Sequence, residues 1–158
     1  MAISVLREIA TNISRSTFFC VVSDECTDSS NQEQLVICIR WIDDQLEPHQ
    51  DFLGLYQVDN ICADTLVAVI KNTLIRMNLS LSKCRGQCYD GASTMKGARN
   101  GAAKQLRDEE PRAIYLHCNG HALNLASGDT VKKSKLMKDA LDVTYEVSKL
   151  VRYSPIKA

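Results

Sequence analysis

Two aspartates stand directly after short apolar segments, where a carboxylate could do chemistry. Asp24 follows the segment 17–23, and Asp90 follows the segment 83–89. Carboxylate oxygens are hard ligands for Mg²⁺ or Mn²⁺, and two of them beside a cleft can support two-metal phosphoryl transfer. An Asp in such a position also commonly forms a turn or caps a helix, and Asp90-Gly91 is by itself a good turn dipeptide. On composition alone the second interpretation is favoured.

Seven cysteines and three histidines raise the question of a zinc site. Cys84 and Cys88 on one strand would be about 13 Å apart at ~3.3 Å per residue, whereas two thiolates on one zinc are at most ~4.6 Å apart. Cys118 and His121 supply only two ligands, and His117 alternates to the other face of its strand. We therefore expect no structural zinc.

The composition is that of one globular domain, with 158 residues, 45% hydrophobic and 24% charged. No apolar run reaches the ~20 residues of a membrane helix. The N-terminal segment has Arg7 and Glu8 inside its apolar pattern, unlike a signal peptide. Most cysteines lie in apolar runs, which is typical of reduced thiols. We expect a protein of the nucleus or the cytoplasm that is neither secreted nor bound to a membrane.

The net charge is zero, but the charges are unevenly distributed. Residues 17–65 hold ten acids and one base, and residues 66–112 hold nine bases and four acids. Such a division suits a metal site beside a phosphate-binding surface, while solvated faces of either sign are the simpler explanation.

Hydrophobic periodicity predicts the elements that must position these residues. Apolar alternation indicates strands, and three-four spacing indicates helices. The predicted order is a helix (1–14), three strands (17–23, 33–43, 51–58), a helix (63–77), a strand (83–89), a helix (97–109), a strand (113–118) and two helices (121–128, 134–152).

This order predicts an α/β, ribonuclease H-like fold. By analogy with that fold, we expect a five-stranded mixed sheet of order 3-2-1-4-5 with helices on both faces. The first and fourth strands are then parallel neighbours, so Asp24 and Asp90 would share one rim. We expect segment 17–23 to be buried on both faces, and Asp24 and Asp90 to lie within about 8 Å of each other.

Three motifs resemble signature segments of hAT-superfamily transposases: SDECTDSSNQEQLVICIRW (23–41), GQCYDGASTMKG (86–97) and HCNGHALNL (117–125). The similarity is greatest to the transposase-derived domain of unknown function found in zinc-finger MYM-type-like proteins and in the repressor of the protein-kinase inhibitor. It covers about residues 15 to 155.

The resemblance implies roles for individual residues. Asp24 matches the first catalytic acid and Asp90 the second, and the two would bind Mg or Mn weakly. Cys118 and His121 match the C-x-x-H pair, whose His is an active-site residue near DNA. Two further residues, Thr27 and Asp28, belong to the first motif, where capping the turn is the simpler account.

The resemblance also shows what this chain lacks. The family's third acid, a Glu, lies beyond a large helical insertion, and the zinc-finger and oligomerisation regions fall outside this sequence. We expect 1–158 to be a single partial core, with 15–130 as the core and 131–158 as the start of the helical region. The expected function is a transposase core fragment, ancestrally for two-metal DNA cleavage and strand transfer, that is inactive alone.

The alternative is a domesticated nuclear binding module that acts in DNA binding, protein interaction or transcriptional regulation. Both interpretations expect DNA as a partner, and the second adds proteins. Whether the chain is an enzyme stays open at this point, because the third acid is missing from it.

Overall fold

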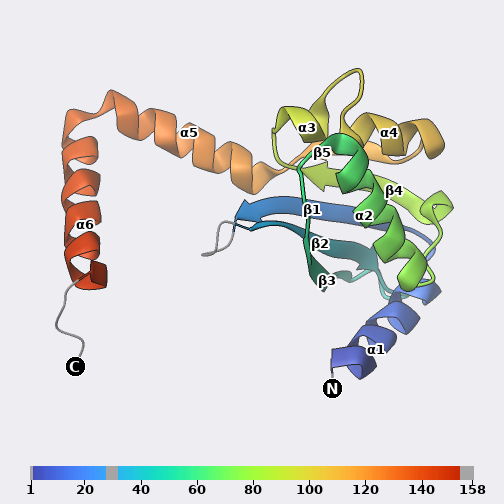
Figure 1. Cartoon of the computed structure of the whole chain (residues 1–158). Coiled ribbons are helices and arrows are strands. Elements are labelled where there is room, and N and C mark those ends of the chain that lie inside the picture. Colours follow the sequence, from blue (N-terminus) through green and yellow to red (C-terminus); the bar gives the residue numbers. More distant parts are fainter. Residues whose placement is uncertain (1, 28–31, 154–158) are drawn as a thin grey trace. The chain divides into compact units, whose positions relative to one another are not determined.

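The computed structural model describes residues 2–27 and 32–153, and it divides the chain into two compact units (Figure 1). The first unit comprises Met1–Cys118 and the second Asn119–Ala158. Among the described residues, no helix is long and apolar enough to cross a membrane.

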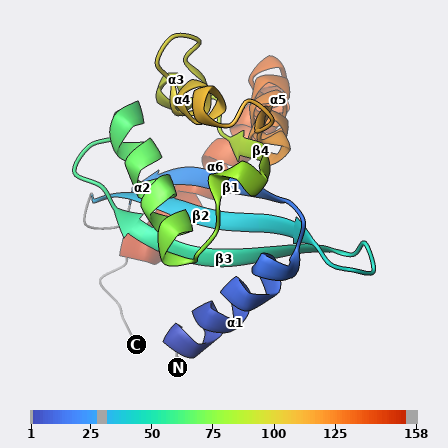
Figure 2. The ribbon, with the colours of Figure 1, turned by 90° about the vertical axis from the view of Figure 1, so that its right-hand side faces the viewer.

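Five strands form one mixed sheet in the first unit (Figure 1), and Figure 2 shows the three antiparallel strands of it side by side. They are β1 (Phe19–Thr27), β2 (Glu33–Ile42), β3 (Pro48–Gln57), β4 (Cys84–Tyr89) and β5 (Ile114–His117). The order is β3-β2-β1-β4-β5, with antiparallel pairing among β1, β2 and β3 and parallel pairing of β4 with both β1 and β5. The predicted sheet order is confirmed.

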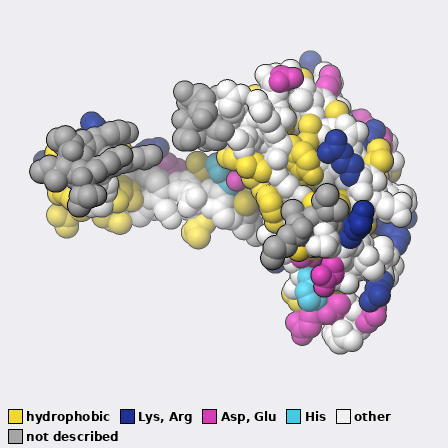
Figure 3. Space-filling view, turned by 60° about the horizontal axis from the view of Figure 1, so that its bottom comes forward, with side chains coloured by type: hydrophobic (Ala, Val, Ile, Leu, Met, Phe, Trp, Pro, Cys, Tyr) yellow, Lys and Arg dark blue, Asp and Glu magenta, His cyan; other side chains and the backbone are white. Residues whose placement is uncertain are grey.

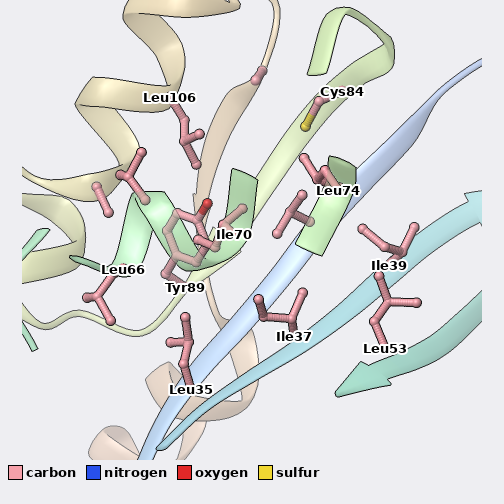
Figure 4. Packing of buried hydrophobic residues seen from close by; sticks show 14 of the residues in the cluster. Leu35, Ile37, Ile39, Leu53, Leu66, Ile70, Leu74, Cys84, Tyr89 and Leu106 are labelled. Atoms are coloured by element: carbon pink, nitrogen blue, oxygen red, sulfur yellow. The ribbon is translucent and has the colours of Figure 1, made fainter. Parts of the chain in front are cut away.

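The helices of the first unit supply one face of the hydrophobic core. They are α1 (Ala2–Arg15), α2 (Ala63–Arg76), α3 (Ser93–Lys96) and α4 (Ala102–Glu109), with a 3₁₀ turn, η1 (Leu81–Lys83), before β4. Figure 4 shows side chains of α2 and α4 facing those of the central strands. Labelled there are Leu66, Ile70 and Leu74 of α2, Leu106 of α4, and Leu35, Ile37 and Ile39 of β2.

Strand β1 is buried on one face rather than on both, which corrects the expectation from its unbroken apolar sequence. Phe19 and Val21 are buried, whereas Cys20 and Val22 are only partly buried. The reason is that the core-forming helices pack on the face of Val21. We call the other side the open face; its exposed hydrophobic side chains include Phe52, Ile114 and Leu116.

The predicted helix 97–109 begins later than expected, at Ala102. Gly101 donates its amide hydrogen to the Gly97 carbonyl oxygen at 2.9 Å, and a Cβ added at Gly101 would lie 2.3 Å from the Gly97 nitrogen. The chain therefore doubles back at a point where only glycine fits, and this tight turn separates α3 from α4.

The second unit consists of two helices, α5 (Asn119–Lys133) and α6 (Lys135–Tyr153). Ser134 separates them, and its Oγ accepts a hydrogen bond from the Met137 amide at 3.4 Å, as an N-cap residue does. Hydrophobic side chains lie exposed on both helices (Figure 3). The sequence placed the end of the core at residue 130, and the assignment of 119–130 to it stays a prediction.

Candidate carboxylate site

Asp24 and Asp90 both lie near the rim of the sheet where the pairing of β1 with β4 ends. The parallel ladder of β1 and β4 pairs Cys20 with Gly86 and Val22 with Cys88, and each acid follows two residues later in its chain segment. Side chains alternate along a strand, so the Asp24 carboxylate belongs to the open face, whereas Asp90 follows the last residue of β4 and its approach to Asp24 stays a prediction. Asp24 is exposed and Asp90 is partly buried.

Asp24 lies inside β1 instead of directly after it. The pairing of β1 with β4 ends at Val22 and Cys88, but its antiparallel pairing with β2 continues to Thr27 and Glu33. The strand therefore extends beyond its apolar segment, because β2 continues to supply hydrogen bonds there. Asp24 thus has a backbone fixed by a ladder on one side.

Asp90 is anchored by local hydrogen bonds. Its Oδ1 accepts from the Ala92 amide at 3.1 Å, and its carbonyl oxygen accepts from the Tyr115 hydroxyl at 3.2 Å. The first of these bonds is the turn-forming role that the Asp-Gly dipeptide allowed. Turn formation and a place at the rim thus occur in the same residue, so the two interpretations of Asp90 do not exclude each other.

A histidine that sequence analysis set aside lies beside this turn. A Cβ added at Gly91 would be 3.1 Å from His117 Nε2 and 3.7 Å from Lys96 Nζ. His117 and Lys96 therefore approach the backbone next to Asp90, from β5 and α3. Because side chains alternate along β5, His117 lies on the helix-covered face and Cys118 on the other. The approach of His117 to Gly91 depends on the pairing of β4 with β5, in which Tyr89 is the partner of His117.

Glu25 is a third acid near the rim that sequence analysis missed. Burial, and next the charge of Asp90, raise the pKa of the Glu25 carboxyl, with smaller contributions from Glu33 and Asp24. Thr94 Oγ1 opposes the shift by donating a hydrogen bond to Glu25 Oε1 at 3.3 Å. The signal in the sequence was the position of Glu25 directly after Asp24. Because side chains alternate along a strand, Glu25 belongs to the helix-covered face of the sheet.

The other motif residues have separate places. Thr27 Oγ1 lies 3.2 Å from both carboxylate oxygens of Glu33, where it closes the end of the β1–β2 ladder. Asp28 lies outside the described residues. Cys118 donates its amide hydrogen to the Tyr89 carbonyl oxygen at 2.8 Å, which sets Cys118 opposite Asp90. His121 is in α5 of the second unit, so its approach to the carboxylates stays a prediction.

The donor set suits a hard cation only in part. Over residues 2–27 and 32–153, no group of three or more His, Cys, Asp or Glu side chains is placed to hold a metal ion. Asp24 and Asp90 as a pair of oxygen donors stay a prediction from the sequence. Such a pair fits Mg²⁺ or Mn²⁺, which readily keep water as their remaining ligands.

Comparison with known proteins identifies relatives of this chain. The family model DUF4371, described as "ZMYM1/FAM200, RNase-like domain", matches residues 1–101. The human "52 kDa repressor of the inhibitor of the protein kinase" is 27% identical over 124 residues, which cover 77% of this chain and 16% of that protein. Its mouse counterpart is 28% identical over 123 residues, which cover 76% and 16%. The chain thus spans about a sixth of these relatives' length.

Among solved structures, an endonuclease V of Ciona intestinalis, in complex with a 24mer DNA, is similar over 72% of this chain and 54% of its own. The sequence identity is 16% and the TM-score is 0.35. A TM-score of this size is below the level that marks a shared fold.

Proposed function

Because this chain belongs to the ZMYM1/FAM200, RNase-like domain family, which is transposase-derived, we propose that it carries the first two acids of an hAT-type transposase site. Asp24 and Asp90 would hold a divalent cation weakly, and 1–158 alone would bind DNA without cutting it. The observation that supports the proposal is the parallel pairing of β1 with β4, which ends at Val22 and Cys88, two residues before each acid.

The metal site follows from the chemistry of the rim. Bound between the two carboxylates, Mg²⁺ or Mn²⁺ would supply positive charge for phosphoryl transfer. The chain's own residues hold the acids: the Ala92 amide and the Tyr115 hydroxyl anchor Asp90, and the β1–β2 ladder fixes Asp24. With two carboxylates, the positions of ions and DNA are loosely set. Phosphoryl transfer depends on such positioning, so we expect no cleavage.

Bases near the rim support DNA as the partner. Lys96 approaches the turn at Gly91, and residues 66–112 hold nine bases against four acids. Phosphate contacts from such residues are independent of sequence and weaken steeply with salt. The proposed DNA binding is accordingly non-specific, and we propose the nucleus as its place.

The first test is Mn²⁺ binding to 1–158, followed by the electron paramagnetic resonance signal of the unbound ion. We expect weak binding by the wild-type chain and a loss of at least tenfold in affinity for Asp24→Asn and for Asp90→Asn. The control is Asp44→Asn, since Asp44 lies just beyond the end of β2 that is farthest from Glu33. Equal binding by all four proteins would contradict the metal site.

The second test is a nicking assay on plasmid DNA with Mn²⁺. We expect no product from the wild-type chain. Metal-dependent nicking that both Asn variants abolish would show that the two acids suffice or that a further acid completes the site. In that case the chain is an active nuclease, and the proposal of an incomplete site is wrong.

A domesticated binding module is the second candidate function. The observation that favours it is the exposed hydrophobic surface of the open face, where Phe52, Ile114 and Leu116 are each more than half exposed. This candidate predicts that DNA or protein binding is the same with and without Mn²⁺ and is unchanged in the Asp24→Asn, Asp90→Asn double variant. The transposase-type site predicts that Mn²⁺ strengthens DNA binding only in the wild-type chain.

A further inference from the structure

Four thiols share the open face of the sheet, and two of them are diagonal neighbours at its end. These cysteines come from neighbouring strands, are all partly buried and are all reduced: Cys20, Cys38, Cys88 and Cys118. Burial, and next the neighbouring Cys118 thiol, raise the pKa of the Cys88 thiol, and the β4–β5 ladder makes these two cysteines diagonal neighbours. We propose that Cys88 and Cys118 are an oxidisable pair that forms a reversible disulfide beside Asp90. This proposal does not depend on the proposed function.

The register of β4 and β5 brings the two thiols together. Cys88 pairs with Leu116, and the bond from the Cys118 amide to Tyr89 extends the ladder by one more pair, so the two cysteines are diagonal neighbours. Cys118 lies two residues after Leu116, which is the ladder partner of Cys88. Because side chains alternate along a strand, both thiols lie on the open face.

Closing the bond requires a small movement, which the end of β5 allows. Diagonal neighbours in a ladder are about 7–8 Å apart, whereas a disulfide needs Cα atoms within about 4.4–6.8 Å. Cys118 follows the last residue of β5 and precedes α5, so the ladder holds it on one side only. A bond made under this slight strain is easily reduced, which favours a reversible switch over a permanent cross-link.

The other thiols of the open face are less able to pair. Cys20 is diagonal to Cys88 across the β1–β4 ladder, but both lie within paired strands that hold their backbones. Cys38 and Cys88 both pair with Val22, from opposite sides, so β1 stands between them. The geometry therefore favours one pairing among the four.

The reaction balances with hydrogen peroxide as the oxidant. One of the two sulfurs, as thiolate, attacks a peroxide oxygen, which breaks the O–O bond, forms a sulfenic acid and releases hydroxide. The second thiolate then attacks the sulfenic sulfur, which forms the S–S bond and releases a second hydroxide. With the two thiol protons, two waters form. The two thiols lose two electrons in total and the peroxide gains them.

The test maps the disulfide by mass spectrometry. The chain is treated with hydrogen peroxide under native conditions, its remaining thiols are alkylated, and it is digested with trypsin without reduction. Trypsin separates the two cysteines into peptides 86–96 and 113–132, each of which holds a single cysteine. We expect these peptides joined, at a mass two hydrogens below their sum, and separated by dithiothreitol.

Variants distinguish this pair from general thiol oxidation. Cys88→Ser and Cys88→Ala should abolish the joined peptides, while Cys38→Ser on the same face should leave them unchanged. Circular dichroism checks that each variant is folded. Joined peptides that link Cys118 to Cys20, or full alkylation of Cys88 and Cys118 after Cys62 has been oxidised, would overturn the proposal. Cys62 is exposed, and a hydrogen bond with Thr65 lowers the pKa of its thiol, so it reports that oxidant was present.

Discussion

Two adjacent valines of β1 test which face of the sheet carries the core. Val21 is fully buried, and Val22 is partly buried on the open face. Each Val→Ala change removes two methyl carbons, worth ~0.8 kcal/mol each when fully buried, or about 1.6 kcal/mol of transfer free energy. At Val21 the closed cavity adds to this, so we expect Val21→Ala to lower the free energy of unfolding by about 2–3 kcal/mol. At Val22 only part of the transfer applies and solvent reaches the site, so we expect about 0.5–1 kcal/mol.

The pair is its own control, because both changes lose the same β-branched residue from the same strand. The assay is urea unfolding followed by fluorescence of Trp41, the one tryptophan of the chain. Trp41 lies on β2, where its Nε1 donates to Asp51 Oδ2 at 2.7 Å and its ring stacks on His49, so its emission reports on the sheet. Equal costs for the two variants, or a larger cost at Val22, with unchanged m-values, would refute the assignment of the faces.

The same titration checks three further predictions. Tyr89→Phe should leave the free energy of unfolding unchanged or raise it by up to ~1 kcal/mol, because in the described structure the fully buried Tyr89 hydroxyl has no hydrogen-bond partner; a clear loss would reveal one. Glu110→Gln should destabilise the protein at neutral pH, because Arg112 holds the folded-state pKa of Glu110 at about 2 through two 2.7 Å hydrogen bonds. The pKa of Glu110 is lower in the folded than in the unfolded chain. The difference in free energy of unfolding between the variant and the wild type should therefore shrink as pH falls below about 4 and vanish below the folded-state pKa. A difference that stays constant with pH would contradict this reasoning. Gly86→Ala should lower the free energy of unfolding by about 1–3 kcal/mol, because the added Cβ would lie 2.7 Å from Cys20 Sγ. In a chain that also carries Cys20→Ala, the same change should cost less. Equal costs with and without Cys20→Ala would show that this contact is not the cause.

Most elements could be predicted because their signals are local. Alternation identified β2 within one residue of its observed end, and helical spacing identified α2 equally well. The split of the predicted helix 97–109 was missed, although Gly97 and Gly101 were its signal, because the close approach of two backbones is visible only in three dimensions. The sheet order itself came from analogy with the ribonuclease H-like fold, since no local pattern states which strands pair.

The sequence by itself determined the types and order of the elements and the two acids after apolar segments, because periodicity and turn residues act over a few positions. Tertiary structure alone decided the rest of the site. The partial burial of Val22, the approach of Glu25 and Asp90, and the diagonal placement of Cys88 and Cys118 all depend on the register between β1, β4 and β5. That register joins residues far apart in the chain, and a slip by one position would turn every one of these side chains to the other face.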